Sequence, residues 1–160
     1  MSIIIRPYKN ADKKEVAKLF DVFEDYLISI DYIKIVGKQP DYGNKYLKLT
    51  LKSISNKKGI MYVALSKGRI IGLIVAIILP SSKDPGSKPG VRGRVTELYV
   101  EKDHRREGVG LALMKVAESY FKSKHCKRIF IDVFVPNASA HKFYMKLGYA
   151  DCDIDMIKKL

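Results

Sequence analysis

The sequence predicts one domain of the mixed α/β class, with a central mixed, largely antiparallel sheet and helices on both faces. Two patterns indicate this fold: the second half alternates strands and helices, whereas the first half carries a helix pair and a hairpin. The length of 160 residues suits a single domain, residues 1–160, with a core of its own. Its 47% of hydrophobic residues is ordinary for a globular chain.

The first half opens with a short strand and two helices. An apolar run predicts the strand over Ile3–Arg6. Asn10 or Asp12 then suits the cap of a helix that runs to about Ile30, because its apolar residues recur at spacings of three and four. A similar but less regular stripe predicts a second helix over Asn44–Ile54.

Two apolar runs on either side of a turn signal predict an antiparallel hairpin. The strands are Ile60–Leu65 and Ile70–Leu79, and the turn between them is Lys67-Gly68-Arg69. The prolines and glycines of residues Pro80–Gly93 then predict a loop.

Five further elements are expected in the second half. A helix is expected to end at Gly148, which suits a C-cap. The strand after it is predicted by the alternating apolar face of Cys152, Ile154 and Met156. In chain order the elements are the strand Arg94–Val100, the helix Gly108–Lys124, the mostly buried strand Arg128–Val135, the helix from Asn137 to about Leu147 and the strand Tyr149–Ile157.

The formal net charge of +13 is compatible with an anionic partner such as nucleic acid, an acidic membrane or a polyphosphate cofactor. The lysines are spread from Lys9 to Lys159 without a long basic run, which favours a solvated surface over nucleic-acid binding. No apolar run approaches the roughly 20 residues that span a bilayer, so no membrane partner is expected. The N-terminus lacks the pattern of a signal peptide, and two cysteines form no disulfide framework, so a cytoplasmic protein is expected.

The segment Arg105–Gly110 lies between a strand pattern and a helix pattern. A glycine turn before a helix presents unpaired backbone N–H groups at the positive end of the helix dipole, where phosphate oxygens bind. Gly108 and Gly110 lack Cβ atoms and let a diphosphate approach the main chain, while Arg105 and Arg106 add charge and fixed donors. The sequence therefore predicts a site for a phosphate-bearing cofactor.

Two motifs flank the helix that follows this turn. The first is Leu98-Tyr99-Val100 followed by Arg105-x-x-Gly108-x-Gly110, and the second is Asn137-x-x-Ala140-x-x-Phe143-Tyr144-x-Lys146-x-Gly148-Tyr149. Together they resemble the GNAT superfamily of acetyl-CoA-dependent N-acetyltransferases, specifically over residues 94–149 and only in architecture over residues 1–80. The resemblance implies a sheet whose middle strands splay apart to admit acetyl-CoA as co-substrate.

The resemblance also implies where the cofactor binds. The strand before the turn would pair with the pantetheine arm as with an added strand, and the far side of the cleft would also contact it. The implied cofactor-binding residues are Leu98, Tyr99 and Val100 for the arm, Arg105, Arg106, Glu107, Gly108, Val109 and Gly110 for the pyrophosphate, and Asn137 and Tyr144 across the cleft.

N-acetylation needs an unprotonated amine, a polarised carbonyl and a proton for the departing thiolate. The resemblance places Tyr144 where a phenol protonates the sulfur; the alternative is a packing residue beside Phe143. Glu97 precedes the arm-binding strand and is the candidate base. The alternative is that Glu97 is solvated or ion-paired with Arg94 or Arg128; without a base, proximity of the reactants drives the reaction.

Three further expectations concern this site. A backbone N–H near Leu98 or Tyr99 is expected to polarise the carbonyl. Asn137 is a helix cap, a cofactor contact or both. Glu107 is expected to point to solvent or to pair with Arg106. No metal site is expected, because the three histidines show no metal-ligand spacing with the cysteines.

The function expected is transfer of an acetyl group from acetyl-CoA to a primary amine by direct attack in a ternary complex. The acceptor is a small cationic amine or a protein lysine or N-terminus, and the sequence leaves a homodimer open. The alternatives are a non-catalytic acyl-CoA-binding module and, ranked last, a basic nucleic-acid-binding protein. Carboxylates and tyrosines between the first two helices suit a cationic acceptor, although an ordinary exposed loop is slightly favoured: Asp25, Tyr26, Asp31, Tyr32, Asp41 and Tyr42.

Overall fold

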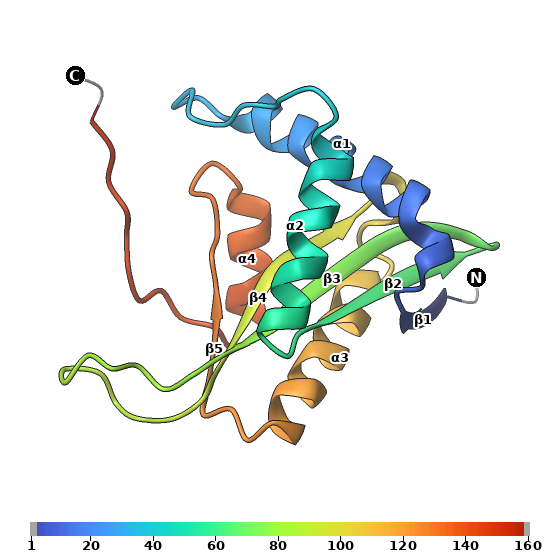
Figure 1. The fold of residues 1–160 in the computed structure, drawn as a ribbon. Coiled ribbons are helices and arrows are strands. Elements are labelled where there is room, and N and C mark those ends of the chain that lie inside the picture. The colour runs from blue at the N-terminus through green and yellow to red at the C-terminus, as the bar shows by residue number, and fades with distance from the viewer. Residues whose placement is uncertain (1–2, 159–160) are drawn as a thin grey trace.

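Five strands form one open sheet in the computed structural model, which describes residues 3–158 (Figure 1). Neighbouring strands follow the chain order β1-β2-β3-β4-β5, and every pair is antiparallel except β4 and β5, which are parallel. The mixed, largely antiparallel sheet predicted from the sequence is therefore confirmed. The strands are β1 (Ile3–Pro7), β2 (Ile60–Ser66), β3 (Arg69–Leu79), β4 (Arg92–Val100) and β5 (Arg128–Ile131).

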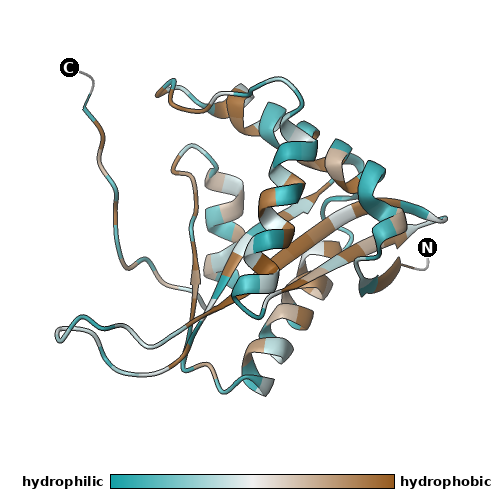
Figure 2. Cartoon of the chain, in the orientation of Figure 1, coloured by the Kyte–Doolittle hydropathy of each residue, from teal (hydrophilic) through white to brown (hydrophobic). Residues whose placement is uncertain are grey.

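Helices cover both faces of the sheet, as expected. The helices α1 (Lys13–Ile30) and α2 (Tyr42–Asn56) pack on one face, and α3 (Val109–Ser123) and α4 (Ala138–Lys146) pack on the other (Figure 1). The central strand β3 is apolar along nearly its whole length (Figure 2) and is buried on both sides, because its alternate residues enter the two cores.

The α1 helix begins after a short 3₁₀ turn, Asn10–Asp12. Asp12 stands at its N-cap position, but its carboxylate accepts from the Lys9 N–H at 2.7 Å and pairs with Arg6 at 2.7 Å. Asp12 is therefore at the N-cap, one of the two positions predicted for it, although its side chain stabilises the turn before the helix and not the first turn of the helix itself.

Gly43 allows the first turn of α2 to lie directly against α1. A Cβ atom at this position would come within 2.1 Å of the Ala17 carbonyl oxygen and 2.5 Å of the Asp21 carboxylate. The Gly43 N–H also donates to Asp21 Oδ1 at 3.2 Å. The close approach of these two helices therefore depends on a residue without a side chain.

Gly43→Ala is expected to destabilise the fold by about 1–3 kcal/mol, because a backbone oxygen cannot move aside as a flexible side chain can. Urea unfolding measures this change. Gly37→Ala is the matched control, since a Cβ at Gly37 meets no atom within 4 Å. Equal stability of the two variants would contradict the contact.

One extra residue interrupts β4. Glu97 lies opposite Val75 of β3 and Val95 lies opposite Ala76, so Thr96 has no partner and forms a β-bulge. On its other edge β4 pairs with β5 only up to Val95, which faces Ile131. Beyond the bulge the second half of β4 bonds to β3 alone, which confirms the expected splaying of the middle strands.

Two strand predictions in the last third are wrong. β5 ends at Ile131 rather than Val135, where its partner strand β4 bulges. It is half-buried rather than mostly buried because it is an edge strand of the sheet. Residues 149–157 form no strand, and Ile154 and Met156 are 79% and 92% exposed. Their apolar alternation meets no neighbouring strand, and Figure 1 shows this segment leading away from the sheet towards the C-terminus.

Candidate active site

A cavity of about 250 Å³ opens where β4 and β5 part. Side chains from both faces of the sheet reach it, because the gap between the strands passes through the sheet. The lining comes from α1 (Phe23, Glu24, Leu27), α2 (Tyr42, Tyr46), β4 (Val95, Thr96, Glu97, Leu98), β5 and the segment after it (Ile131, Asp132, Val133, Phe134) and α4 with its cap (Asn137, Ala140, Tyr144).

The free edge of β4 continues into the glycine turn at the start of α3. Gly108 has a φ of +83°, a conformation that favours glycine, and Arg106 has a φ of +70°. The Ala112 N–H donates to the Gly108 carbonyl at 2.9 Å, so the N–H groups of Val109 and Gly110 lie before the first intrahelical bond. These donors at a helix N-terminus form a site suited to an anion.

Arg105 turns inward rather than towards the open side of this turn. Its Nε donates to the Val100 carbonyl at 3.0 Å, and its guanidinium lies 4.7 Å from the Tyr26 ring centroid. Glu107 lies 3.2 Å from His104 Nδ1, a pair that the sequence did not predict. Within residues 3–158, the Arg106 side chain makes no hydrogen bond, ion pair or contact with an aromatic ring, in contrast to Arg105.

Glu97 lies in the cavity and accepts a hydrogen bond from the Tyr46 hydroxyl. The pKa of Glu97 is raised to about 7: burial is the main cause, the Tyr46 hydrogen bond opposes the rise, and the nearby Glu24 charge adds to it. Its suggested partners are engaged elsewhere, since Arg94 pairs with Asp132 at 2.5 Å and Arg128 donates to a backbone carbonyl. A carboxylate of this kind can take up a proton near neutral pH.

Tyr144 reaches the same cavity from α4. It is 9% exposed, and burial with the charge of Glu97 raises the pKa of Tyr144 to about 12. Its hydroxyl has no hydrogen-bond partner among residues 3–158 and stays protonated at neutral pH. Tyr144 packs beside Phe143 at 5.3 Å between ring centroids, so it belongs both to the core and to the cavity.

Asn137 caps α4, one of its two expected roles. Its Oδ1 accepts from the Ala140 N–H at 3.4 Å and from the Tyr26 hydroxyl at 3.2 Å. The second bond ties α1 to the start of α4 across the cavity, whose wall includes Asn137.

None of the aspartates expected near the acceptor lines the cavity; of the residues suggested there, only Tyr42 does. Asp31 accepts from four backbone N–H groups, those of residues 33–36, at 2.7–2.9 Å, and Asp41 accepts from the Asn44 side chain. Both hold loop structure and neither lines the cavity. The cavity instead holds Glu24 and Tyr46, which sequence reasoning missed.

Glu24 and two tyrosines form the wall of the cavity opposite α4. Tyr42 donates to the Glu24 carboxylate at 2.9 Å. The Tyr42 and Tyr46 rings stack with centroids 5.2 Å apart and an interplanar angle of 13°. The i, i+4 spacing of the tyrosines on α2 was the available signal, since such residues share one face of a helix.

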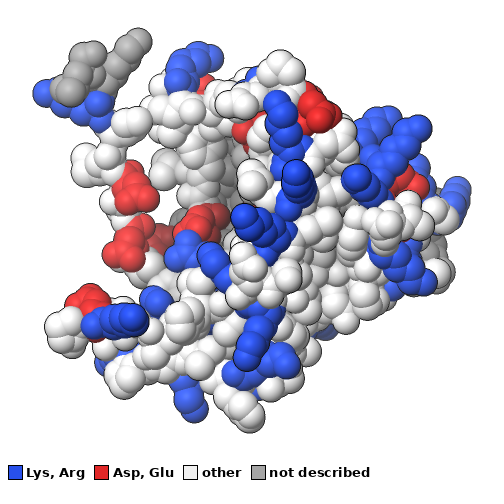
Figure 3. Space-filling view, viewed as in Figure 1, with Lys and Arg blue, Asp and Glu red and all other residues white. Residues whose placement is uncertain are grey.

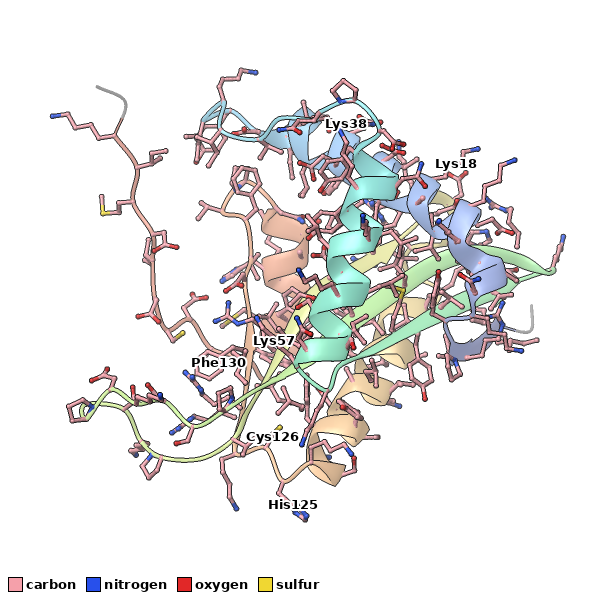
Figure 4. The ribbon with its side chains drawn as sticks, in the orientation of Figure 1. Lys18, Lys38, Lys57, His125, Cys126 and Phe130 are labelled. Atoms are coloured by element: carbon pink, nitrogen blue, oxygen red, sulfur yellow. The ribbon has the colours of Figure 1, made fainter. Side chains whose placement is uncertain are left out.

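The remaining reactive side chains lie apart from this cavity. Figure 4 places His125 and Cys126 beyond the end of α3, away from α2 and α4. Within residues 3–158 no group of three or more histidine, cysteine, aspartate and glutamate residues could hold a metal ion. None of the helices described there is long and apolar enough to cross a membrane.

Comparisons with known proteins find similar sequences and similar folds. The model of the acetyltransferase (GNAT) family matches residues 19–149. An uncharacterized N-acetyltransferase of Methanocaldococcus jannaschii is 36% identical over 91 residues, 56% of this chain and 52% of the relative, so the match spans about half of that relative's length. An N-alpha-acetyltransferase of Sulfurisphaera tokodaii is 24% identical over 141 residues, covering 86% of this chain and 80% of the relative.

The fold is also found among solved structures. A mutant Bacillus halodurans protein superposes with a TM-score of 0.84 at 21% identity, covering 98% of this chain and 99% of that one. At this identity the likeness shows the fold alone.

Proposed function

The chain belongs to the acetyltransferase (GNAT) family, and on that premise we propose that it is an acyltransferase that acetylates a primary amine by direct attack on acetyl-CoA in a ternary complex. The observation that carries the proposal is that Glu97 and Tyr144 reach one cavity from opposite faces of the sheet. A proton acceptor and a proton donor are thereby available at the same opening.

Acetyl-CoA fits the surfaces that border this cavity. The N–H groups at the start of α3 and Arg106 would hold the diphosphate, and the unpaired edge of β4 over Leu98–Val100 would hold the arm. Asn137 and Tyr144 would contact it from the other side. The reactive thioester would then lie beside Glu97.

The transfer forms one bond and breaks another. The amine nitrogen bonds to the thioester carbonyl carbon, and the carbon–sulfur bond breaks. Glu97 takes the proton that the nitrogen loses, directly or through water, and Tyr144 gives its proton to the departing sulfur. A backbone N–H of β4 near Leu98 or Tyr99 would stabilise the charge that develops on the carbonyl oxygen.

Tyr144→Phe is the test of this proposal. It removes only the hydroxyl, so we expect kcat to fall by about 10²-fold, the low end for general acids because a thiolate is a good leaving group. CoA release from acetyl-CoA with a panel of amines and peptides measures turnover, and calorimetry measures CoA affinity. CoA affinity should change little, because phenylalanine keeps the ring that would contact the cofactor and the diphosphate would be held elsewhere.

The two alternative functions predict different results for the unchanged protein in assays of CoA release, CoA binding and nucleic-acid binding. A protein that binds CoA but never releases it from acetyl-CoA with any amine is an acyl-CoA-binding module. A protein that ignores CoA and binds DNA or RNA with steep salt dependence is a nucleic-acid-binding protein. Either result would refute the transferase proposal.

A further inference from the structure

Two carboxylates face the cavity without a basic partner. Neither Glu24 nor Glu97 lies within 4 Å of a lysine, arginine or histidine nitrogen among residues 3–158; their hydrogen bonds come from Tyr42 and Tyr46. The chain has 30 lysines and arginines, so basic residues are not scarce. A ligand cation is therefore the natural counter-charge for this part of the protein.

Nearby acidic groups are neutralised in the ordinary way. Lys38, labelled near the upper end of α2 in Figure 4, lies 2.8 Å from Asp25 and 3.4 Å from Asp21 on α1. Glu24 lies between them in sequence but points into the cavity. In this part of α1, Asp21 and Asp25 are therefore neutralised by Lys38, whereas Glu24 has no basic partner among residues 3–158.

Apolar side chains and aromatic rings form part of the cavity wall near the two carboxylates. Phe23 and Leu27 come from α1, and the stacked rings of Tyr42 and Tyr46 come from α2. Aromatic faces attract cations and also pack well against methylene groups. The resulting pattern of anion, apolar wall and anion is complementary to an alkyl chain with an ammonium at each end.

The two carboxylates cannot both serve the reacting nitrogen well. A carboxylate that stays charged beside that nitrogen stabilises its ammonium form, which has no lone pair and cannot attack. Glu97 avoids this problem by accepting the proton. Glu24 lacks that role and is useful to binding when it neutralises a second, non-reacting cation.

We propose that the acceptor is a diamine or longer polyamine, with its reacting nitrogen at Glu97 and its second ammonium in a subsite formed by Glu24 and Tyr42. This inference rests on the proposed function and narrows its substrate class. Figure 3 shows acidic side chains around the hollow beside α2, on a face where most of the other charged side chains are basic. Negative groups at the mouth would favour entry of such a cation.

The test compares 1,4-diaminobutane with butylamine, which has the same carbon chain and one nitrogen fewer. We expect kcat/KM for the diamine to be about 10- to 100-fold higher, the range of a hydrogen bond to a charged group. Glu24→Gln keeps an acceptor for Tyr42 but loses the charge. It should remove most of the diamine's advantage over butylamine, mainly by raising KM for the diamine.

Glu118→Gln is the matched control, since Glu118 lies on α3 and accepts from Tyr149 outside the cavity. Equal use of both amines, equal loss with both in Glu24→Gln, or preference for a peptide N-terminus over the diamine would overturn the subsite and leave the transferase proposal standing. If no amine is acetylated, the transferase proposal fails. Calorimetry of diaminobutane with the CoA-saturated protein then still tests the subsite, because Glu24→Gln should abolish any binding.

Discussion

Glu97→Gln is expected to lower kcat by about 10²- to 10⁴-fold, the range that a general base contributes. Glutamine can still accept the Tyr46 hydrogen bond, so the cavity should keep its shape while the proton acceptor is lost. Initial rates at saturating acetyl-CoA measure the effect. Calorimetry should show that Glu97→Gln binds CoA as tightly as the unchanged protein does. The control variant Glu118→Gln should retain full activity.

The pH dependence gives this prediction a second readout. The base acts only when deprotonated, and burial raises the pKa of Glu97 to about 7, so activity should fall as the pH drops below about 7. The free substrate amine titrates identically in assays of the unchanged protein and of Glu97→Gln, so its contribution cancels in the ratio of the two rates. A ratio that stays constant between pH 5.5 and 8.5 would remove Glu97 from the role of base.

Phe121→Ala is expected to destabilise the protein by about 3–5 kcal/mol, as removal of a buried aromatic side chain does. Phe121 is 1% exposed and lies in the core between α3 and the sheet. Leu111→Ala is the control on the same helix, since Leu111 is 40% exposed. Denaturant unfolding of both variants measures the difference, and equal losses would contradict the packing.

A double-mutant cycle sharpens this test. A Cβ atom at Gly93 of β4 would lie 2.5 Å from the Phe121 ring, so the ring occupies the space that a side chain at Gly93 would need. Gly93→Ala should therefore be less destabilising in the Phe121→Ala protein than in the unchanged protein. Additive effects would show that the two residues do not share that space.

Most elements of the fold could be predicted because their periodicity agrees with their surroundings. The apolar run of β3 and the stripe of α1 each face a core, so pattern and burial coincide. The segment 149–157 has the alternation of a strand but no neighbouring edge to pair with. Alternation reports which side chains can share a face, whereas pairing depends on a partner that a single segment does not reveal.

The candidate site could be predicted only in part. The glycine turn and Tyr144 follow from short motifs, and Glu97 follows from its position just before Leu98-Tyr99-Val100, the segment proposed to bind the pantetheine arm. Glu24 and Tyr46 belong to helices whose stripes look like ordinary core packing, and only tertiary contact brings them to Glu97. Asp31 looked like a ligand group because the four N–H groups that it holds are invisible in the sequence.

The opening between β4 and β5 begins at the unpaired Thr96. Val95 faces the core beneath α3, whereas Glu97, two positions on, faces α2; a regular strand would put both on the same side. A chain shortened by Thr96 alone would thus keep every neighbouring side chain on its present side and could continue the ladder to β5. Loss of a single codon would thus close the mouth of the cavity and leave the sheet continuous there, without changing any of the candidate catalytic residues.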